Sequence, residues 1–139
     1  METAVICDID GTLALCEQGR EKSYYYDRDF MLDKLNEPIA EIVRKFYMDV
    51  DQMIIVSGRK EKNRRVTEAW LEDNDIPYDM LLMRKDDDNG PDNLTKCNIY
   101  LEHIREKFNV FFVLDDRDRV VKMWRDQGLT CLQVAEGDF

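Results

Sequence analysis

Five short apolar segments alternate with four segments of helical periodicity, and this alternation constrains the fold more than any other feature of the sequence. The apolar segments are predicted strands at Ala4–Asp8, Met53–Val56, Met80–Met83, Val110–Leu114 and Thr130–Val134. Strands that alternate with helices form a parallel sheet with helices on both faces. We therefore expect an α/β three-layer sandwich of the Rossmann type, with a central five-stranded parallel sheet, in one domain spanning residues 1–139.

The third helical segment follows the turn residues Gly90-Pro91, and Asp92 or Asn93 is expected to cap its first turn. Apolar residues at steps of four, three and four predict that its buried stripe consists of Cys97, Leu101, Ile104 and Phe108. The segment after the second strand, which begins Ser57-Gly58-Arg59, is polar and predicts a loop.

No apolar run approaches the roughly 20 residues that a membrane helix needs, and the N-terminus lacks the pattern of a secretion signal. The four cysteines are scattered, with no Cys-x-x-Cys pair, which favours reduced thiols and a cytoplasmic location. The one histidine, His103, lies in a helical pattern, which argues against a histidine-based catalytic triad and against a zinc site.

Polar residues cluster at the ends of the predicted strands, where ligands bind in sheets of this kind. They are Asp8 and Asp10 after the first strand, Ser57 and Arg59 after the second, Arg84 after the third, and Asp115 and Asp116 after the fourth. Lys96 lies early in the helix that precedes the fourth strand. If the strands are parallel, these side chains meet at one edge of the sheet.

Four carboxylates gathered at one edge repel one another unless a cation offsets their charge. Because the ligands would be hard oxygen atoms without histidine or thiolate, Mg²⁺ is the expected ion, held by Asp8, Asp10, Asp115 and Asp116. Beside such an ion Asp8 can attack phosphorus and form an aspartyl-phosphate, while Asp10 acts as proton donor and then as base. Gly11 permits the sharp turn that this arrangement requires.

The sequence Asp8-Ile9-Asp10-Gly11-Thr12 after an apolar strand resembles the first motif of the haloacid dehalogenase superfamily of phosphohydrolases. Ser57, Lys96 and Asp115-Asp116 stand, in the right order, where the second, third and fourth motifs of that superfamily are expected. Further similarity extends over essentially the whole chain to the 3′-phosphatase domain of phage polynucleotide kinase. It is carried by Val56-Ser57-Gly58-Arg59, Leu114-Asp115-Asp116-Arg117, Met123-Trp124-Arg125 and the ending Gln133–Phe139.

The resemblance implies a HAD-like fold and a magnesium-dependent hydrolase that removes a 3′-phosphate, or also a 2′,3′-cyclic phosphate, during repair of RNA or DNA ends. Carried over by position, Asp8 is the nucleophile and Asp10 the acid and base. Ser57, Lys96, Arg20, Arg59 and Arg84 become phosphate or substrate ligands, and Asp115 and Asp116 the acidic pair at the metal. The short spacers leave little room for a large cap domain, and the phosphate loop of a kinase is absent from this sequence.

The net charge of −10 argues against a broad nucleic-acid-binding surface. A local basic patch from the run Arg59, Lys60, Lys62, Arg64 and Arg65 would answer this objection, although such a run is also typical of a solvated helix start. The triple Tyr24-Tyr25-Tyr26 fits packing over the sheet edge, a subunit contact or stacking on a terminal base.

Three other functions stay open at this point. A phosphatase of the same superfamily that acts on a small phosphate ester would share the mechanism and suit the acidic surface. A metal-dependent nuclease would use the same acidic cluster. A phospho-accepting receiver domain is disfavoured, because its lysine should follow the last strand, where this chain has Ala135-Glu136-Gly137.

The sequence leaves undecided the preference for DNA or RNA, the oligomeric state including a homodimer, the division of labour between Asp115 and Asp116, and whether the domain stands alone or belongs with a kinase domain.

Overall fold

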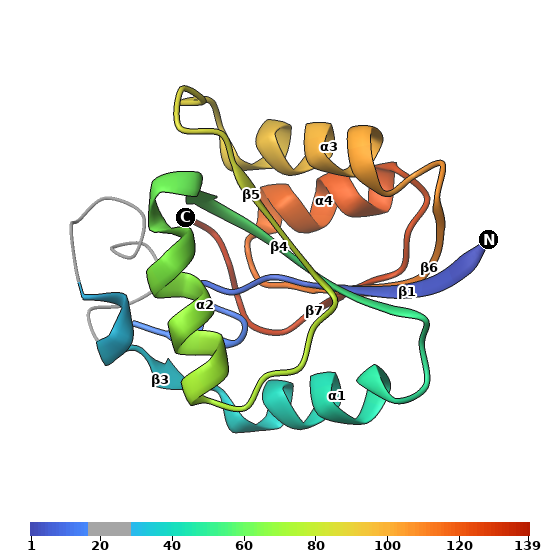
Figure 1. The fold of residues 1–139 in the computed structure, drawn as a ribbon. Helices are drawn as coiled ribbons and strands as arrows, with labels where there is room; N and C mark the ends of the chain where they lie inside the picture. The colour runs from blue at the N-terminus through green and yellow to red at the C-terminus, as the bar shows by residue number, and fades with distance from the viewer. Residues whose placement is uncertain (17–28) are drawn as a thin grey trace.

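Strand β1 (Glu2–Cys7) is the central strand of the sheet, because its side chains from Ala4 to Cys7 are apolar and buried on both faces. It pairs in parallel with β4 (Gln52–Lys60) on one side and with β6 (Phe108–Asp115) on the other. Strands β5 (Met80–Arg84) and β7 (Cys131–Gln133) add in parallel at the edges. The computed structural model, which describes residues 1–16 and 29–139, thus contains the predicted five-stranded parallel sheet, in the order β5-β4-β1-β6-β7 (Figure 1).

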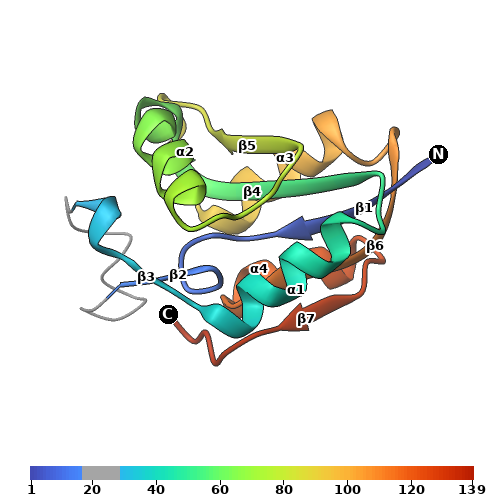
Figure 2. The ribbon, with the colours of Figure 1, turned by 60° about the horizontal axis from the view of Figure 1, so that its bottom comes forward.

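Four α-helices of the described residues cover the two faces of this sheet, as the alternating pattern predicted. Helices α1 (Glu37–Tyr47) and α2 (Arg64–Asp73) pack on the face to which Val5 and Cys7 of β1 point. Helices α3 (Asp92–His103) and α4 (Asp118–Asp126) pack on the opposite face, against Ala4 and Ile6. Figures 1 and 2 show α3 and α4 together on one side of the sheet and α1 on the other. The α/β three-layer architecture is therefore confirmed.

A tight turn follows β1 and reverses the chain beside the end of the sheet. Gly11 has a φ of 84°, which a residue without a side chain adopts at little cost, as the sequence predicted. The turn leads to a small antiparallel pair of β2 (Ala14–Leu15) and β3 (Lys34–Leu35). Two short 3-10 helices, η2 (Phe30–Leu32) and η3 (Glu61–Asn63), flank the same end of the molecule. Arg20 and Tyr24-Tyr25-Tyr26 lie outside the described residues.

The prediction of a loop that begins at Ser57 is wrong, because strand β4 continues to Lys60. Its pairing with β5 becomes irregular after Ser57, where Ser57 pairs with Met83 and Lys60 with Arg84. Two extra residues of β4 therefore face a single step of β5. The polar residues keep the extended conformation because the neighbouring strand resumes pairing beyond them.

The buried stripe predicted for α3 is also wrong in part. Leu101 is 42% exposed, and Phe108 begins strand β6 after the helix has ended at His103. The face that α3 buries instead carries Thr95, Lys96, Ile99 and Tyr100. Hydrophobic periodicity counts a lysine as a surface residue. Here Lys96 points inward because it binds the carboxylates of Asp8, Asp115 and Asp92, and α3 therefore buries the face that carries the lysine.

In the part of the chain that the structure describes, no helix combines the length and the hydrophobicity needed to cross a membrane.

Candidate active site

Three buried carboxylates meet where the central strands end. Asp8 follows β1, Asp115 closes β6, and Asp116 is the next residue. Because β1 and β6 are parallel neighbours, and the backbone N–H of Asp8 donates to the carbonyl of Leu114, both ends lie at the same edge of the sheet. One oxygen from each of the three carboxylates lies within 4.8 Å of the other two. The predicted meeting of Asp8 with the acidic pair is therefore present.

This cluster fits a divalent cation chemically. Its ligand atoms are carboxylate oxygens alone, which suits a hard ion such as Mg²⁺ rather than zinc. All three aspartates are at most 2% exposed, so water cannot offset their charge. Burial raises the pKa of the Asp8 carboxyl well above its usual range, and the nearby Asp115 charge raises it further. A bound cation would favour the ionised form that a nucleophile requires. The cluster can thus hold a metal ion.

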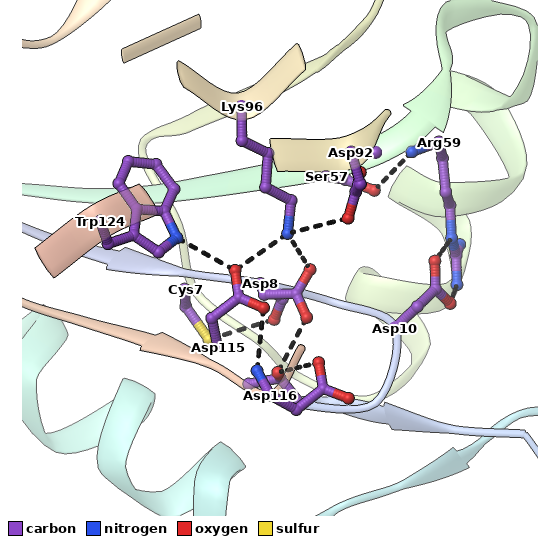
Figure 3. Close-up of polar contacts among 12 residues, drawn as sticks. Cys7, Asp8, Asp10, Ser57, Arg59, Asp92, Lys96, Asp115, Asp116 and Trp124 are labelled. Carbon is purple, nitrogen blue, oxygen red and sulfur yellow. Dashed lines mark hydrogen bonds and ion pairs between the residues drawn. The ribbon is translucent and has the colours of Figure 1, made fainter. Parts of the chain in front are cut away.

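Lys96 brings a positive charge into the cluster from the first half of α3. Its Nζ donates to Asp8 Oδ1 at 2.7 Å and to Asp115 Oδ2 at 3.0 Å, and the lysine is 1% exposed (Figure 3). This charge lowers the pKa of Asp8, opposing burial and the charges of Asp115 and Asp116, all of which raise it. Lys96 therefore lies where it offsets part of the carboxylate repulsion and fixes the direction of the Asp8 side chain.

The structure gives Asp115 and Asp116 different surroundings. Asp115 accepts hydrogen bonds from Lys96 and, at 3.1 Å, from the indole N–H of Trp124, while its second oxygen accepts the backbone N–H of Asp116 at 2.8 Å. Asp116 instead faces Thr12, whose hydroxyl lies 3.4 Å from Asp116 Oδ1 and 2.8 Å from Asp8 Oδ2. Lys96 thus binds Asp115 and one oxygen of Asp8, whereas Asp116 shares Thr12 with the other Asp8 oxygen and lies further from the lysine (Figure 3).

Asp10 turns away from the acidic cluster and pairs with Arg59. The Arg59 Nε and Nη2 atoms donate to the two Asp10 oxygens at 2.9 and 2.7 Å, a two-pronged arrangement that fixes the carboxylate plane. Both side chains are buried, at 7% and 6% exposed. Among the described residues Asp10 does not belong to the group that can hold a metal ion. Its side chain as a metal ligand, and Arg59 as a phosphate ligand, stay predictions.

Asp92 belongs to this site, although the sequence analysis treated it only as a helix cap. The cap predicted at Asp92 or Asn93 is wrong, because Pro91 is the N-cap of α3 and Asp92 is its first residue, 3% exposed. One oxygen lies 3.3 Å from Arg84 Nη2, and the other lies 3.9 Å from Lys96 Nζ. The signal in the sequence was the four-residue spacing from Asp92 to Lys96, which places both side chains on one helix face.

Gly58 explains how Asp92 comes so close to the sheet. A Cβ atom at position 58 would overlap the Asp92 carboxylate, so only a glycine leaves room for it. The neighbouring Ser57 is 1% exposed, and its hydroxyl oxygen accepts the backbone N–H of Arg59 at 3.1 Å. Figure 3 shows Ser57 and Asp92 together, beside Lys96. Ser57 therefore reaches the site from inside strand β4 rather than from a loop.

Arg84 holds the loop between β5 and α3 in place. Its guanidinium donates to the carbonyl oxygens of Gly58 and Gly90, each at 2.7 Å, in addition to its contact with Asp92.

The basic run that was predicted as a possible nucleic-acid patch includes Arg64. This arginine forms an ion pair with Glu61 at 2.7 Å and donates a hydrogen bond to the carbonyl of Leu81. Arg20 was also predicted to bind phosphate, and it lies outside the described residues.

The end of the chain, from Gln133 onward, supports the loop that carries Asp116. A Cβ atom at Gly137 would overlap the carbonyl oxygen of Asp116, and the Gly137 carbonyl accepts the backbone N–H of Asp118 at 2.9 Å. The Gln133 side chain donates to the Asp116 carbonyl at 3.0 Å. These contacts give a structural reason for the terminal motif in the sequence, because it fixes the backbone on which the acidic pair is mounted.

Known proteins are similar to this chain over most or all of its length. Residues 2–139 match the family model described as the polynucleotide kinase PNKP phosphatase domain. A protein of Autographa californica nuclear polyhedrosis virus, named as a bifunctional polynucleotide kinase/RNA ligase, is 36% identical over 126 residues. That match covers 88% of this chain but 18% of the viral protein.

Two solved structures are similar to the whole chain. One, titled as the Pnkp1/Rnl/Hen1 complex, has a TM-score of 0.93 and 41% identity. The other, titled as the Pnkp1/Rnl/Hen1 RNA repair complex, has a TM-score of 0.92 and 42% identity. Both matches cover 100% of this chain, and they cover 48% and 44% of the solved chains. The chain thus spans less than half the length of these relatives.

Proposed function

Because the chain belongs to the family of polynucleotide kinase PNKP phosphatase domains, we propose that it removes the 3′-phosphate from the end of a nucleic-acid strand. The observation that carries this proposal is that one edge of the sheet presents two aspartates with different surroundings. Asp8 lies in the acidic cluster and binds Lys96, whereas Asp10, two residues further on, is bound by Arg59. A phosphatase that forms a covalent intermediate needs a nucleophile and a separate acid and base, and this edge offers both.

In the first step a carboxylate oxygen of Asp8 attacks phosphorus and the bond from phosphorus to O3′ breaks. The electron pair of that bond goes to O3′, which takes a proton from Asp10. Lys96 keeps the Asp8 carboxylate aimed, since it donates to Asp8 Oδ1 at 2.7 Å. Ser57 and Arg84 line the same edge and are the proposed ligands of the remaining phosphate oxygens, together with Arg20.

In the second step Asp10 takes a proton from a water molecule, whose oxygen attacks phosphorus. The bond between phosphorus and the Asp8 oxygen breaks, which restores the Asp8 carboxylate and releases inorganic phosphate, and Asp10 is protonated again. The same group can serve both steps because it donates in one and accepts in the other.

We propose Mg²⁺ as the cofactor, held by Asp8 and Asp116 with Asp115 behind them. The support is the all-oxygen donor set, its burial, and the raised pKa of Asp8. When bound, the cation supplies positive charge to the phosphate oxygens and to the carboxylates around it. Among the described residues of this edge, five buried aspartates stand against four buried cations, so a phosphate dianion would add to an excess of negative charge without it.

The substrate class rests on the relatives. One of the two similar structures is named as an RNA repair complex, and the viral relative is named for polynucleotide kinase and RNA ligase activities. We therefore propose an RNA end as substrate, with a 2′,3′-cyclic phosphate as a second form of that end, and partner proteins of a repair assembly. We further propose that residues 1–139 fold as one domain. The four free cysteines support a reducing, cytoplasmic location.

Phosphate release from four substrates tests this function. They are an RNA and a DNA oligonucleotide with a 3′-phosphate, an RNA with a 5′-phosphate, and a small ester such as a sugar phosphate, each with Mg²⁺ or with EDTA. We expect Mg²⁺-dependent release from the 3′-phosphates and none in Asp8→Asn. Faster turnover of the small ester than of either oligonucleotide would instead favour a metabolite phosphatase, which suits the net charge of −10. Light scattering of the same sample tests the predicted homodimer.

A further inference from the structure

Three residues besides Asp10 contact the guanidinium of Arg59, and these contacts determine where it lies. Arg59 is part of strand β4, and its Nη1 donates to the hydroxyl oxygen of Thr67 in α2 at 3.1 Å. The guanidinium lies over the ring of Phe30 in η2, with 4.0 Å between Cζ and the ring centroid. Asp33, just beyond η2, lies 3.4 Å from Nη2. The two prongs that hold Asp10 are thus fixed from behind and from the side.

The Thr67 hydroxyl has a defined direction. It donates its one proton to the carbonyl of Asn63 at 2.8 Å, one helical turn earlier, and so presents a lone pair to Arg59. Thr67 is 0% exposed, so water cannot replace the hydroxyl as an acceptor. A hydrogen bond to a charged donor in such a place is among the stronger ones in a protein.

Phe30 restricts the remaining freedom of the guanidinium. A cation over an aromatic face is attracted by the ring, and this attraction favours the observed position of the guanidinium. The segment that carries Phe30 is itself tied to α2, since the indole N–H of Trp70 donates to the carbonyl of Asp33 at 3.0 Å. Thr67 and Phe30 therefore act on Arg59 from two elements that are joined to each other.

We propose that Thr67 and Phe30 are positioning residues that act through Arg59 to aim the Asp10 carboxylate. This inference rests on the proposed function, because it assigns Asp10 the proton transfers of both steps. Both residues contact Arg59, which in turn binds Asp10, and neither was singled out by the sequence motifs. Without the Thr67 hydroxyl, the guanidinium still binds Asp10 but pivots about its own bonds, so the carboxylate spreads over several orientations. Proton transfer depends steeply on such alignment.

The two chemical steps separate this role from a general loss of structure. With an activated aryl phosphate, the leaving phenolate departs without a proton, so formation of the Asp8 phosphate needs no help from Asp10. Hydrolysis of that intermediate still needs Asp10 to take a proton from water. A positioning defect therefore slows the second step alone with an aryl phosphate, and slows both steps with a sugar 3′-phosphate.

The experiment measures p-nitrophenol release from p-nitrophenyl phosphate by stopped flow in wild type, Thr67→Val and Thr67→Ser. Valine keeps the shape of threonine and removes the hydroxyl, whereas serine keeps the hydroxyl. Because p-nitrophenolate leaves without a proton, we expect wild type to form the Asp8 phosphate faster than it hydrolyses it and so to release a burst of one p-nitrophenol per enzyme. We expect Thr67→Val to retain this burst at a rate within about twofold of wild type. Its steady-state rate should fall about tenfold, an increase in barrier of about 1.4 kcal/mol. Thr67→Ser should keep most of the wild-type steady-state rate.

Two further variants guard the interpretation. Thr95→Val removes another buried threonine hydroxyl, which donates to Asp88 at 2.6 Å in the first turn of α3, and should leave the ratio of burst rate to steady-state rate unchanged. Phe30→Leu removes the aromatic face and should lower the steady-state rate in the same way, by several fold. This variant keeps the test open if Thr67→Val does not fold.

Two outcomes overturn the inference. One is a wild-type steady-state rate in both Thr67→Val and Phe30→Leu. The other is a fall of burst amplitude and steady-state rate by the same factor, which would mean that fewer molecules are folded. Failure of the proposed function looks different, since wild type would then hydrolyse the aryl phosphate but not a 3′-phosphorylated oligonucleotide. In that case the burst measurement still tests the positioning role.

Discussion

Replacement of Lys96 by methionine tests the electrostatic account of the site most directly. Methionine keeps most of the length and apolar character of the lysine stem and removes only the charged end. That end lies 2.7 Å from Asp8, 3.0 Å from Asp115 and 3.9 Å from Asp92, and the residue is 1% exposed. The variant therefore leaves three buried carboxylates without the cation that they share.

The cost is large because no water can take the place of the lysine. Removal of one partner from a buried ion pair typically destabilises a protein by about 3–5 kcal/mol. We expect Lys96→Met to lose about that much free energy of unfolding at pH 8 in EDTA. At a urea dependence of about 2 kcal/mol per molar, the unfolding midpoint should fall by roughly 2 M. A saturating divalent cation should recover part of the loss, because it supplies positive charge to the same carboxylates.

The loss should depend on pH in a defined direction. Burial and Asp115 already raise the pKa of Asp8 above its unfolded value, and Lys96 is the charge that lowers it, so the pKa rises further in the variant. For an acid whose pKa is raised on folding, the folded state takes up protons more readily than the unfolded state. Stability is then lost as the pH rises from the unfolded pKa through the folded one. Lys96→Met should therefore be closer to wild type at pH 5 than at pH 8.

Tryptophan fluorescence can follow this unfolding, since Trp70 and Trp124 are at most 1% exposed. The matched control is Lys122→Met, which removes a lysine from the exposed pair with Asp126 at 2.8 Å on α4. Such surface pairs contribute about 0.5 kcal/mol or less. A loss below about 1 kcal/mol for Lys96→Met at pH 8 in EDTA, or an equal loss at pH 5 and pH 8, would refute the reasoning.

Three more predictions concern the same edge of the sheet. A Mg²⁺ concentration of about 100 times Kd should stabilise wild type by about 2.7 kcal/mol in thermal or urea unfolding, and Asp116→Asn should lose most of this increment while still folding in EDTA. Gly58→Ala should be destabilised by about 1–3 kcal/mol and should lose phosphatase activity, because the added methyl group meets the Asp92 carboxylate. Wild-type stability together with wild-type activity in this variant would contradict the packing described for Asp92. Burial raises the pKa of Cys131 to about 12 and that of Cys7 well above its usual range, so at pH 8 iodoacetamide followed by peptide mass spectrometry should find both thiols unmodified until urea is added.

The order of the elements and the main site residues followed from the sequence because both depend on local patterns. Apolar runs with turn residues between them placed five strands, and the parallel sheet then followed from their alternation with helices. In such a sheet the residues after β1 and β6 must meet, so Asp8 and Asp116 could be brought together without coordinates. Four further predicted residues, namely Asp10, Ser57, Arg59 and Lys96, also lie at this edge.

What the sequence could not provide was the orientation of side chains whose environment is made by distant segments. Lys96 was predicted at this edge by its motif, but hydrophobic periodicity alone would leave it on the exposed face of its helix. Asp8 and Asp115, 88 and 19 positions away, surround it in the fold, and α3 buries a different face from the one its apolar residues predict. Asp10 turns toward Arg59 rather than toward the acidic cluster, and Thr67 supports it from a third element. A charged side chain can be buried only where opposite charges and hydrogen-bond partners surround it, and distant segments bring those partners together only when the chain folds.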